Sequence, residues 1–290
     1  MGQLLKNRVA VVTGAGNGLG RAEAIGLAAQ GAMVVVNDVG TAPDGQGTSN
    51  SAADQVVAEI KKNGGKAVAN YDSVADESGA ENIIKTAIDN WGRIDVLINN
   101  AGIVRPQMLC DIKTDDWDAV LKVHLYGTMF CTRAACRIMM QQRYGRIINT
   151  SSHCGLGVPM QATYSAAKEG ITGFSRTVAR EMQEYGINCN VIRPIAQYRG
   201  IKNGDPGVEA NKPEDTAALV IYLASEQAEN INGCIFEVWK GHVGLYTDPP
   251  PVEHVLSKDG SWTPDSLAIN MPLTLTKNKK RELISSLPTF

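Results

Sequence analysis

Short runs of apolar residues recur along the first 240 residues, separated by segments in which apolar residues return every three or four positions. Short apolar runs bounded by turn residues are typical of buried parallel strands, and the three-to-four spacing is typical of amphipathic helices. The predicted strands are residues 9–13, 33–37, 66–70, 94–98, 146–150, 188–192 and 234–238. The predicted helices are residues 21–30, 51–63, 80–91, 117–141 and 161–185.

Strands that alternate with helices predict an α/β fold, here one doubly wound Rossmann-type domain with a seven-stranded parallel sheet. We expect this domain to span residues 1–245. In such sheets, ligands bind beyond the carboxyl ends of the strands. Candidate site residues are therefore those that directly follow a predicted strand.

A glycine-rich turn joins the first predicted strand to the first helix. Its candidate residues are Gly14, Gly16, Asn17, Gly18, Leu19 and Gly20. A strand, a glycine turn and a helix together favour a dinucleotide site, because glycines let the backbone approach a pyrophosphate and the helix start offers unbonded N–H groups. A tight turn without a ligand is the alternative.

Polar residues follow the next strands as well. Asp38 ends the second strand, where a carboxylate can accept both ribose hydroxyls of an adenosine and repel a 2′-phosphate, so it favours NAD over NADP. A simple turn residue is the other interpretation of Asp38. The third and fourth strands are followed by Asp72, Ser73, Asn99, Ala101 and Gly102. Their common position at strand ends strengthens the prediction of a dinucleotide site.

Tyr164 and Lys168 lie four residues apart in a predicted helix and therefore share a face. An ammonium ~4 Å from a phenol lowers its pKa by roughly three units, which would let the tyrosine exchange a proton with a hydroxyl near neutral pH. Such pairs also occur on solvated helix faces. This proton transfer also needs a hydride acceptor, which the predicted dinucleotide would supply, and a second hydroxyl. Ser151 and Ser152, which follow the fifth strand, are the candidates for that hydroxyl.

These motifs resemble those of the short-chain dehydrogenase/reductase family. The resemblance covers about residues 6–240 and rests on residues 13–20, residues 99–102, Ser152 and residues 164–168. Within the family, the chain most resembles the (3R)-hydroxyacyl-CoA dehydrogenase part of the peroxisomal multifunctional β-oxidation enzyme and its bacterial relatives. Residues 34–40, 65–74, 123–125 and 262–264 support that branch.

The resemblance implies a role for each catalytic candidate. Tyr164 would be the acid/base, and Lys168 would lower its pKa and hold the nicotinamide ribose. Ser152 would bind the substrate oxygen, with Ser151 as the alternative.

Two positions depart from the family pattern. His124 stands where many members have an asparagine that holds a water; a histidine could hold a water or relay a proton, or could be a buried side chain with a backbone partner. Pro194 is implied to meet the nicotinamide amide through its backbone, but Ile195 follows it where many members have glycine.

The predicted function is NAD-dependent interconversion of a secondary alcohol and a ketone, with a 3-hydroxyacyl-CoA or related CoA ester as substrate. A hydroxysteroid dehydrogenase and a non-catalytic nucleotide-binding partner subunit are the alternatives. The loop between Pro194 and Pro213 is short, which suits a large substrate, and Arg105, Arg199 and Lys202 could meet CoA phosphates.

Composition narrows the class of protein. The net charge of -2 gives no reason to expect binding to nucleic acid or anionic lipid, and no run of 18 apolar residues predicts a membrane span. Six cysteines in apolar segments predict buried thiols of a cytoplasmic protein, and their spacing does not predict a metal site. These cysteines are Cys110, Cys131, Cys136, Cys154, Cys189 and Cys234.

Residues 246–290 do not continue the strand and helix pattern of the domain, since the three prolines at 249–251 cannot continue a strand. We expect an extension that packs on the domain or on a neighbouring subunit, with a helix entering near Pro264. The helices at 117–141 and 161–185 carry more apolar surface than one contact can cover, which predicts a homo-oligomer, a dimer or tetramer.

Overall fold

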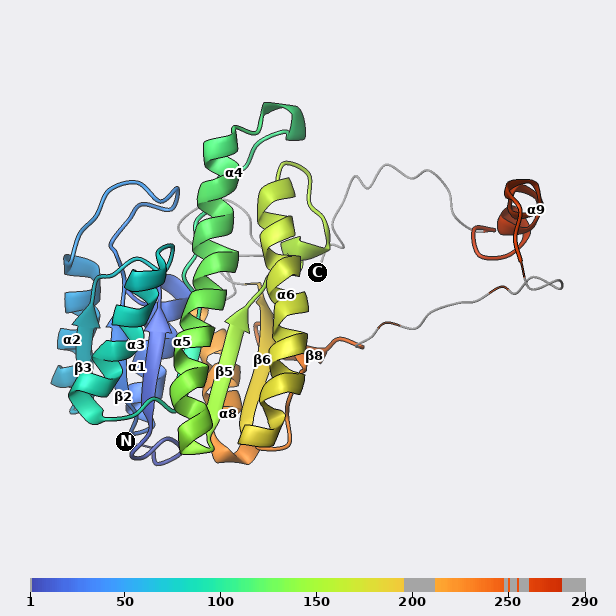
Figure 1. Cartoon of the computed structure of the whole chain (residues 1–290). Helices are drawn as coiled ribbons and strands as arrows, with labels where there is room; N and C mark the ends of the chain where they lie inside the picture. Colours follow the sequence, from blue (N-terminus) through green and yellow to red (C-terminus); the bar gives the residue numbers. More distant parts are fainter. Residues whose placement is uncertain (1, 196–211, 248–249, 251–254, 256–260, 278–290) are drawn as a thin grey trace. The chain divides into compact units, whose positions relative to one another are not determined.

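The computed structural model describes residues 2–195, 212–247, 250, 255 and 261–277. Its sheet has eight strands in the order β3-β2-β1-β4-β5-β6-β7-β8, and the first seven are parallel (Figure 1). The strands are β1 Val9–Thr13, β2 Met33–Asn37, β3 Lys66–Asn70, β4 Val96–Asn99, β5 Gly145–Thr150, β6 Ile187–Pro194, β7 Ile235–Trp239 and β8 His242–Leu245. The predicted α/β fold is confirmed.

The eighth strand corrects the predicted seven-stranded parallel sheet, because β8 pairs antiparallel with β7. Trp239 lies opposite His242, so the hairpin turn consists of Lys240 and Gly241 alone. Both turn residues have positive φ, 31° and 75°, as two-residue hairpin turns of the mirror-image type require. The usual Asn-Gly or Asp-Gly signal of such a turn is missing, since lysine occupies the first position.

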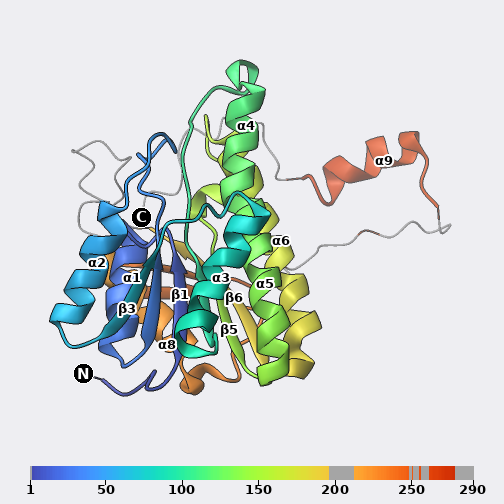
Figure 2. The same ribbon diagram turned by 60° about the vertical axis from the view of Figure 1, so that its left-hand side comes forward.

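Helices cover both faces of the sheet (Figure 2). The helices of the domain are α1 Gly18–Ala29, α2 Ser51–Lys62, α3 Glu77–Trp91, α4 Thr114–Leu121, α5 Gly127–Gln142, α6 Ala162–Met182 and α8 Pro213–Ala224, and the extension contains α9 Pro264–Asn270. One face carries α1, α2 and α8, and the other carries α3, α5 and α6. All helices on the sheet therefore begin near the carboxyl ends of strands, where a ligand site is expected.

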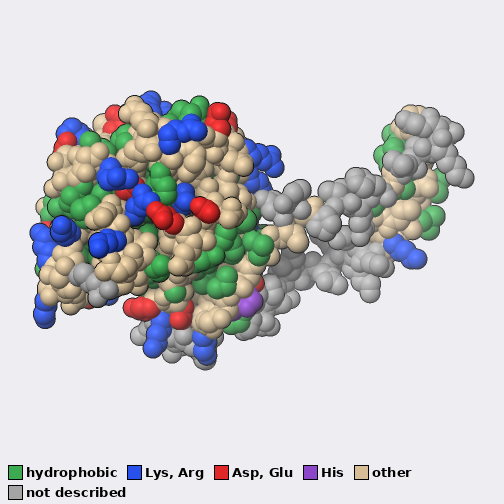
Figure 3. Space-filling model, turned by 90° about the horizontal axis from the view of Figure 1, so that it is seen from below, with side chains coloured by type: hydrophobic (Ala, Val, Ile, Leu, Met, Phe, Trp, Pro, Cys, Tyr) green, Lys and Arg blue, Asp and Glu red, His purple; other side chains and the backbone are tan. Residues whose placement is uncertain are grey.

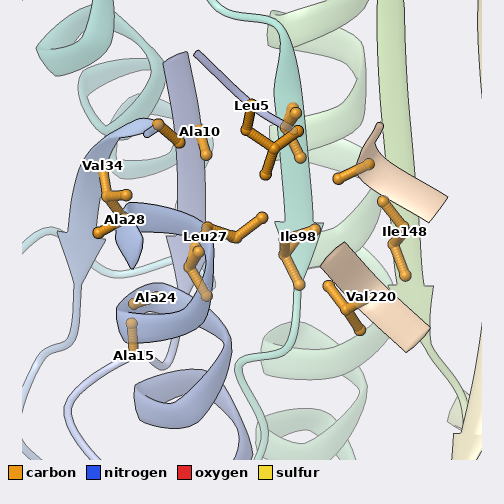
Figure 4. Packing of buried hydrophobic residues seen from close by; sticks show 14 of the residues in the cluster. Leu5, Ala10, Ala15, Ala24, Leu27, Ala28, Val34, Ile98, Ile148 and Val220 are labelled. Carbon is orange, nitrogen blue, oxygen red and sulfur yellow. The ribbon is translucent and has the colours of Figure 1, made fainter. Parts of the chain in front are cut away.

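At the opposite end, where the strands begin, basic and acidic side chains are interspersed over the surface (Figure 3). Between the two ends, buried apolar side chains fill the space between the sheet and the helices on each face. On the α1 face, Leu27 points toward the sheet and packs with Ile98, Ile148 and Val220 (Figure 4). This packing holds α1 against the sheet.

The helix predicted at 117–141 is interrupted. A five-residue π-helical turn, Lys122–Tyr126, separates α4 from α5. Such turns insert one extra residue and are frequent at functional sites. This one carries His124, whose side chain is buried.

The chain divides into two compact units, Met1–Tyr246 and Thr247–Phe290. In the second unit, α9 begins at Pro264, as predicted. A reciprocal capping box between Thr263 and Ser266 explains this start, because each side chain bonds the other residue's backbone. The packing of this extension on the domain stays a prediction.

The cysteines are less uniformly buried than predicted. Cys110 is exposed because it lies in the short turn Leu109–Asp111 ahead of α4, and Cys154 and Cys234 are half-buried. Cys131, Cys136 and Cys189 are buried. Among the described residues, no helix combines the length and the apolar character needed to cross a membrane.

Candidate active site

The glycine turn after β1 is tied to the end of β4. Thr13 Oγ1 accepts bonds from the backbone N–H groups of Asn100 and Ala101, both at 3.1 Å. The Asn100 side chain returns two bonds to the carbonyl oxygens of Thr13 and Gly14, both at 3.0 Å. Sequence reasoning did not single out Thr13 or Asn100, although both lie inside the motifs that carried it.

At two positions of the turn, neighbouring atoms come so close to the backbone that only glycine fits. A Cβ atom on Gly20 would lie 2.4 Å from both the Gly14 carbonyl oxygen and Asn100 Nδ2. A Cβ on Gly14 would lie 2.8 Å from Ala101 Cα, and Gly14 also has a positive φ of 64°. At Gly18, by contrast, a Cβ would meet nothing within 4 Å, so the turn has open space on that side.

The first turn of α1 presents unbonded donors to that space. No described residue accepts a bond from the N–H groups of Gly18, Leu19 or Gly20, and Asn17 makes no side-chain cap. Exposed N–H groups and the positive end of the helix dipole favour a bound anion. A dinucleotide pyrophosphate fits this cradle in both charge and clearance.

Asp38 lies beside the turn and is 8% exposed. Its two carboxylate oxygens accept bonds from Gly16 N–H at 2.7 Å and Gly40 N–H at 2.6 Å. These bonds fix the carboxylate at the end of β2, and each oxygen keeps a lone pair that could accept a ribose hydroxyl.

The polar side chains predicted after β3 have partners within the protein. Asn70 Nδ2 donates to Asp72 Oδ2 at 2.7 Å, and the backbone N–H of Asp72 donates to Asn70 Oδ1 at 3.0 Å. Ser73 Oγ accepts from Ala75 N–H at 3.1 Å. Asp72 and Ser73 therefore shape the loop at the expected edge of the site.

Asn99 has a structural role in the interior. Its side chain donates to Thr132 Oγ1 at 3.0 Å and to Asn149 Oδ1 at 2.8 Å, while Asn149 donates to Ser175 Oγ at 2.8 Å. This buried network joins β4 and β5 to α5 and α6. Any contact of Asn99 with a dinucleotide would therefore involve its backbone.

Tyr164 and Lys168 lie on the first two turns of α6, as predicted from their spacing. Lys168 Nζ is 5.4 Å from the centre of the Tyr164 ring and donates to the Thr150 carbonyl oxygen at 2.5 Å. Burial lowers the pKa of Lys168 to about 7. The lysine thus changes its charge near neutral pH, next to the phenol.

The two serines after β5 face different partners. Ser151 Oγ donates to the Lys168 carbonyl oxygen at 3.0 Å and lies 3.1 Å from Thr172 Oγ1, so it is bonded to α6. Ser152 Oγ accepts from Cys154 N–H at 3.1 Å and donates to no described residue. The hydroxyl that can still donate to a ligand is that of Ser152.

His124 places its ring against Tyr164, edge to face, with ring centres 5.1 Å apart. Its Nε2 lies 2.8 Å from the Ile103 carbonyl oxygen and 3.1 Å from Ile103 N, so it has the backbone partner that was one expectation. Burial, with a further contribution from the Lys168 charge, lowers the pKa of His124 to about 3. His124 is therefore neutral at physiological pH.

The opposite ring nitrogen, His124 Nδ1, is buried and has no hydrogen-bond partner among the described residues. The ring also lies close to the β4 loop, since a Cβ on Gly102 would be 2.3 Å from His124 Cε1. Gly102 and His124 therefore form one wall beside Tyr164.

Pro194 ends β6, and Ile195 continues the sheet contact by donating its N–H to the Val238 carbonyl oxygen at 3.0 Å. Arg105 is paired with Asp116 at 2.8 Å and donates to the Asp44 carbonyl oxygen at 2.9 Å, so its charge is already compensated. Arg199 and Lys202 lie outside the described residues. Within the described part of the chain, no three His, Cys, Asp or Glu side chains are placed to share a metal ion.

Comparison with known proteins agrees with this geometry. The family model for short chain dehydrogenases matches residues 8–198. Peroxisomal multifunctional enzyme type 2 of Mus musculus is 52% identical over 240 residues, which are 82% of this chain and 32% of that enzyme. This chain thus spans about a third of the length of that relative.

Two further relatives match almost over their whole length. Hydroxyacyl-CoA dehydrogenase ChsB1 of Mycobacterium tuberculosis is 39% identical over 285 residues, 92% of this chain and 88% of that protein. The crystal structure of a short chain dehydrogenase from Mycobacterium avium superposes with a TM-score of 0.84 at 38% identity, covering 96% of this chain and 97% of the other. The chain belongs to the short-chain dehydrogenase family of oxidoreductases, which use NAD or NADP.

Proposed function

We propose that this protein is an NAD-dependent dehydrogenase that interconverts a secondary alcohol and a ketone in a 3-hydroxyacyl-CoA or a related CoA ester. The observation that carries the proposal is the grouping of Tyr164 with Lys168 and His124, together with a serine after β5, Ser152, whose hydroxyl donates to no described residue. These groups supply a proton carrier, a nearby cation and a hydrogen-bond donor for one substrate oxygen.

NAD is proposed over NADP because of Asp38. Its carboxylate is held by two backbone N–H groups, so it cannot easily turn away from a ribose placed at the end of β2. A 2′-phosphate beside this charge would be repelled, while a ribose diol would donate to it. The donors of Gly18, Leu19 and Gly20 would hold the pyrophosphate.

When bound, the nicotinamide ring accepts or gives the hydride. In the direction of alcohol oxidation, Tyr164 takes the hydroxyl proton and Ser152 donates a hydrogen bond to the substrate oxygen, which fixes that oxygen beside the phenol. Lys168 stabilises the phenolate through its positive charge when it is protonated. Neutral His124 holds the ring of Tyr164 from the side and offers Nδ1 as an acceptor for a water.

The substrate class is supported by the names of the relatives, which include a hydroxyacyl-CoA dehydrogenase and peroxisomal multifunctional enzymes. The name of the hydroxyacyl-CoA dehydrogenase relative favours a CoA ester over a hydroxysteroid.

The test mixes the protein with NAD and with 3-hydroxyacyl-CoA or hydroxysteroid substrates and follows NADH absorbance. We expect NADH from a 3-hydroxyacyl-CoA, and Ser152→Ala should lower kcat about hundredfold. Ser151→Ala is the matched control. It should lower Tm, because the Ser151 hydroxyl bonds α6, and it should lower kcat much less than Ser152→Ala does. If only hydroxysteroids are turned over, the protein is a hydroxysteroid dehydrogenase and the proposed CoA ester is wrong. NAD binding without any turnover would favour a non-catalytic nucleotide-binding subunit.

A further inference from the structure

A buried arginine lies on β6, the strand that pairs with β5, and Ser152 follows β5. The Arg193 side chain, near the end of β6, is 4% exposed and pairs with Glu169 at 2.6 Å. Its guanidinium also faces the ring of Tyr246, 4.7 Å from the ring centre. Desolvating a guanidinium is costly unless its partners are well placed, so these two contacts fix Arg193 between α6 and the last residue of the domain.

Glu169 connects Arg193 to the turn that contains Cys154, whose N–H donates to Ser152 Oγ. It follows Lys168 on α6, and its carboxylate lies against Gly155, where a Cβ would be 2.6 Å from Glu169 Oε1. Gly155 belongs to the short 3-10 turn His153–Leu156, which directly follows Ser152. Arg193 thus holds the carboxylate against which this turn packs.

The same turn orients the hydroxyl of Ser152. Cys154 N–H donates to Ser152 Oγ at 3.1 Å, and Ser165 Oγ donates to the Cys154 carbonyl oxygen at 2.7 Å. Ser165 is the neighbour of Tyr164 on α6. A displacement of the turn would therefore move the Ser152 hydroxyl relative to the phenol.

On its other side, Arg193 is fixed by the β7–β8 hairpin. The Tyr246 hydroxyl donates to Glu237 Oε2 at 3.2 Å, and Glu237 Oε1 lies 2.8 Å from His242 Nε2. The Tyr246 N–H donates to the Ile235 carbonyl oxygen at 2.9 Å. The antiparallel hairpin therefore holds the ring on which the guanidinium rests.

We propose that Arg193 is a positioning residue, which holds the 153–156 turn through Glu169 and makes the orientation of Ser152 depend on the β7–β8 hairpin. The catalytic consequence rests on the proposed function of Ser152, whereas the mechanical coupling does not. Arg193 itself touches no reacting atom in this scheme.

The coupling is tested by the reactivity of Cys154, which is half-buried within the turn. In Arg193→Met, alkylation of Cys154 by iodoacetamide, measured by peptide mass spectrometry, should be at least about threefold faster because the turn opens more often. Exposed Cys110 is the internal reference and should react at an unchanged rate. This readout does not require any enzymatic activity.

Arg146→Met is the matched control variant. Arg146 is also a buried arginine that faces a tyrosine, Tyr144, at 4.4 Å, but it lies at the opposite end of the sheet, on β5. Its substitution should lower Tm and leave Cys154 labelling unchanged. Equal acceleration in both variants would mean a general loss of stability and would overturn the proposal.

Activity provides the second readout. Arg193→Met should lower kcat about tenfold while the KM for NAD stays within about twofold, since the dinucleotide turn is untouched. Arg193→Lys keeps the charge and should recover part of both kcat and Cys154 protection. Glu169→Gln and Tyr246→Leu remove one partner each and should give the same direction of change, so they decide the matter if Arg193→Met does not fold.

Wild-type labelling of Cys154 in folded Arg193→Met, or in both partner variants, would overturn the coupling. Faster labelling with unchanged kcat would overturn the catalytic consequence alone. If no substrate is turned over by the wild type, the proposed function fails, while the labelling result still decides whether Arg193 positions the turn.

Discussion

The two halves of the site are built differently. Around the glycine turn, backbone groups make most of the contacts, and both oxygens of the charged Asp38 are bonded to backbone N–H groups. Around α6, the important groups are side chains buried at a cost, since burial lowers the pKa of Lys168 to about 7 and that of His124 to about 3. His124 Nδ1 has no partner among the described residues.

This difference separates a binding frame from a reactive centre. A frame gains from satisfied bonds, because it must keep one shape whether or not a ligand is present. A reactive centre gains from groups that change charge near neutral pH, even though such groups destabilise the fold. Substitutions should therefore affect binding in the first half and turnover or stability in the second.

The largest expected effect is on turnover in Tyr164→Phe. The ring would still pack on His124, but the proton carrier is lost, so kcat should fall by at least about a thousandfold with NAD affinity within a few-fold. Tyr144→Phe is the control, because Tyr144 lies at the opposite end of the sheet, facing Arg8 at 3.8 Å. Steady-state kinetics and NAD titration measure both quantities. A variant that keeps a tenth of wild-type activity would refute the role of Tyr164.

Lys168→Met should lower kcat about a hundredfold and yet stabilise the fold. The pKa of Lys168 is about 7 in the folded protein, against 10.5 for an unburied lysine, so wild-type stability rises with pH across this window. Below the folded pKa, the full cost of burying the charge is present. The Tm advantage of the variant in calorimetry should therefore be larger near about pH 6 than near about pH 9. The opposite trend would contradict burial as the cause.

Asp38→Ala tests the frame. It removes the acceptor of two backbone N–H groups and the charge that would repel a 2′-phosphate, so the preference for NAD over NADP should shrink about tenfold. Asp38→Asn keeps one carbonyl acceptor and should lose cofactor preference with less loss of Tm. Ratios of kcat/KM for the two dinucleotides measure the preference, and equal use of both by the wild type would exclude this role.

The smallest effect on activity is expected from Glu23→Gln. Glu23 lies on α1, is fully buried, has no partner among the described residues, and burial raises its pKa to about 8. Because this pKa exceeds the 4.5 of an unburied glutamate, wild-type stability falls as pH rises between these values, and glutamine removes that loss. The Tm gain should grow from about pH 5 to about pH 8, with kcat unchanged. A changed kcat would place Glu23 in the reactive centre.

Much of the candidate site followed from sequence because its signals are local. The Tyr164 and Lys168 pair, the glycine turn and the strand ends each depend on residues close together in the chain. The π-helical turn at His124 did not follow, since such turns are rare and the apolar pattern predicts one continuous helix through residues 122–126. The hairpin at Lys240 lacked its usual residues, and the partners of Arg193 are distant in sequence. Self-association stays a prediction.

The close approach of Gly102 to His124 makes these two positions interdependent in evolution. Any side chain at position 102 would have to displace the imidazole ring, because a Cβ there lies 2.3 Å from it. A change from glycine is therefore accessible only after the histidine has been replaced by a smaller residue or has moved. The order in which mutations can be fixed at this wall is thus restricted by geometry, before selection on catalysis acts at all.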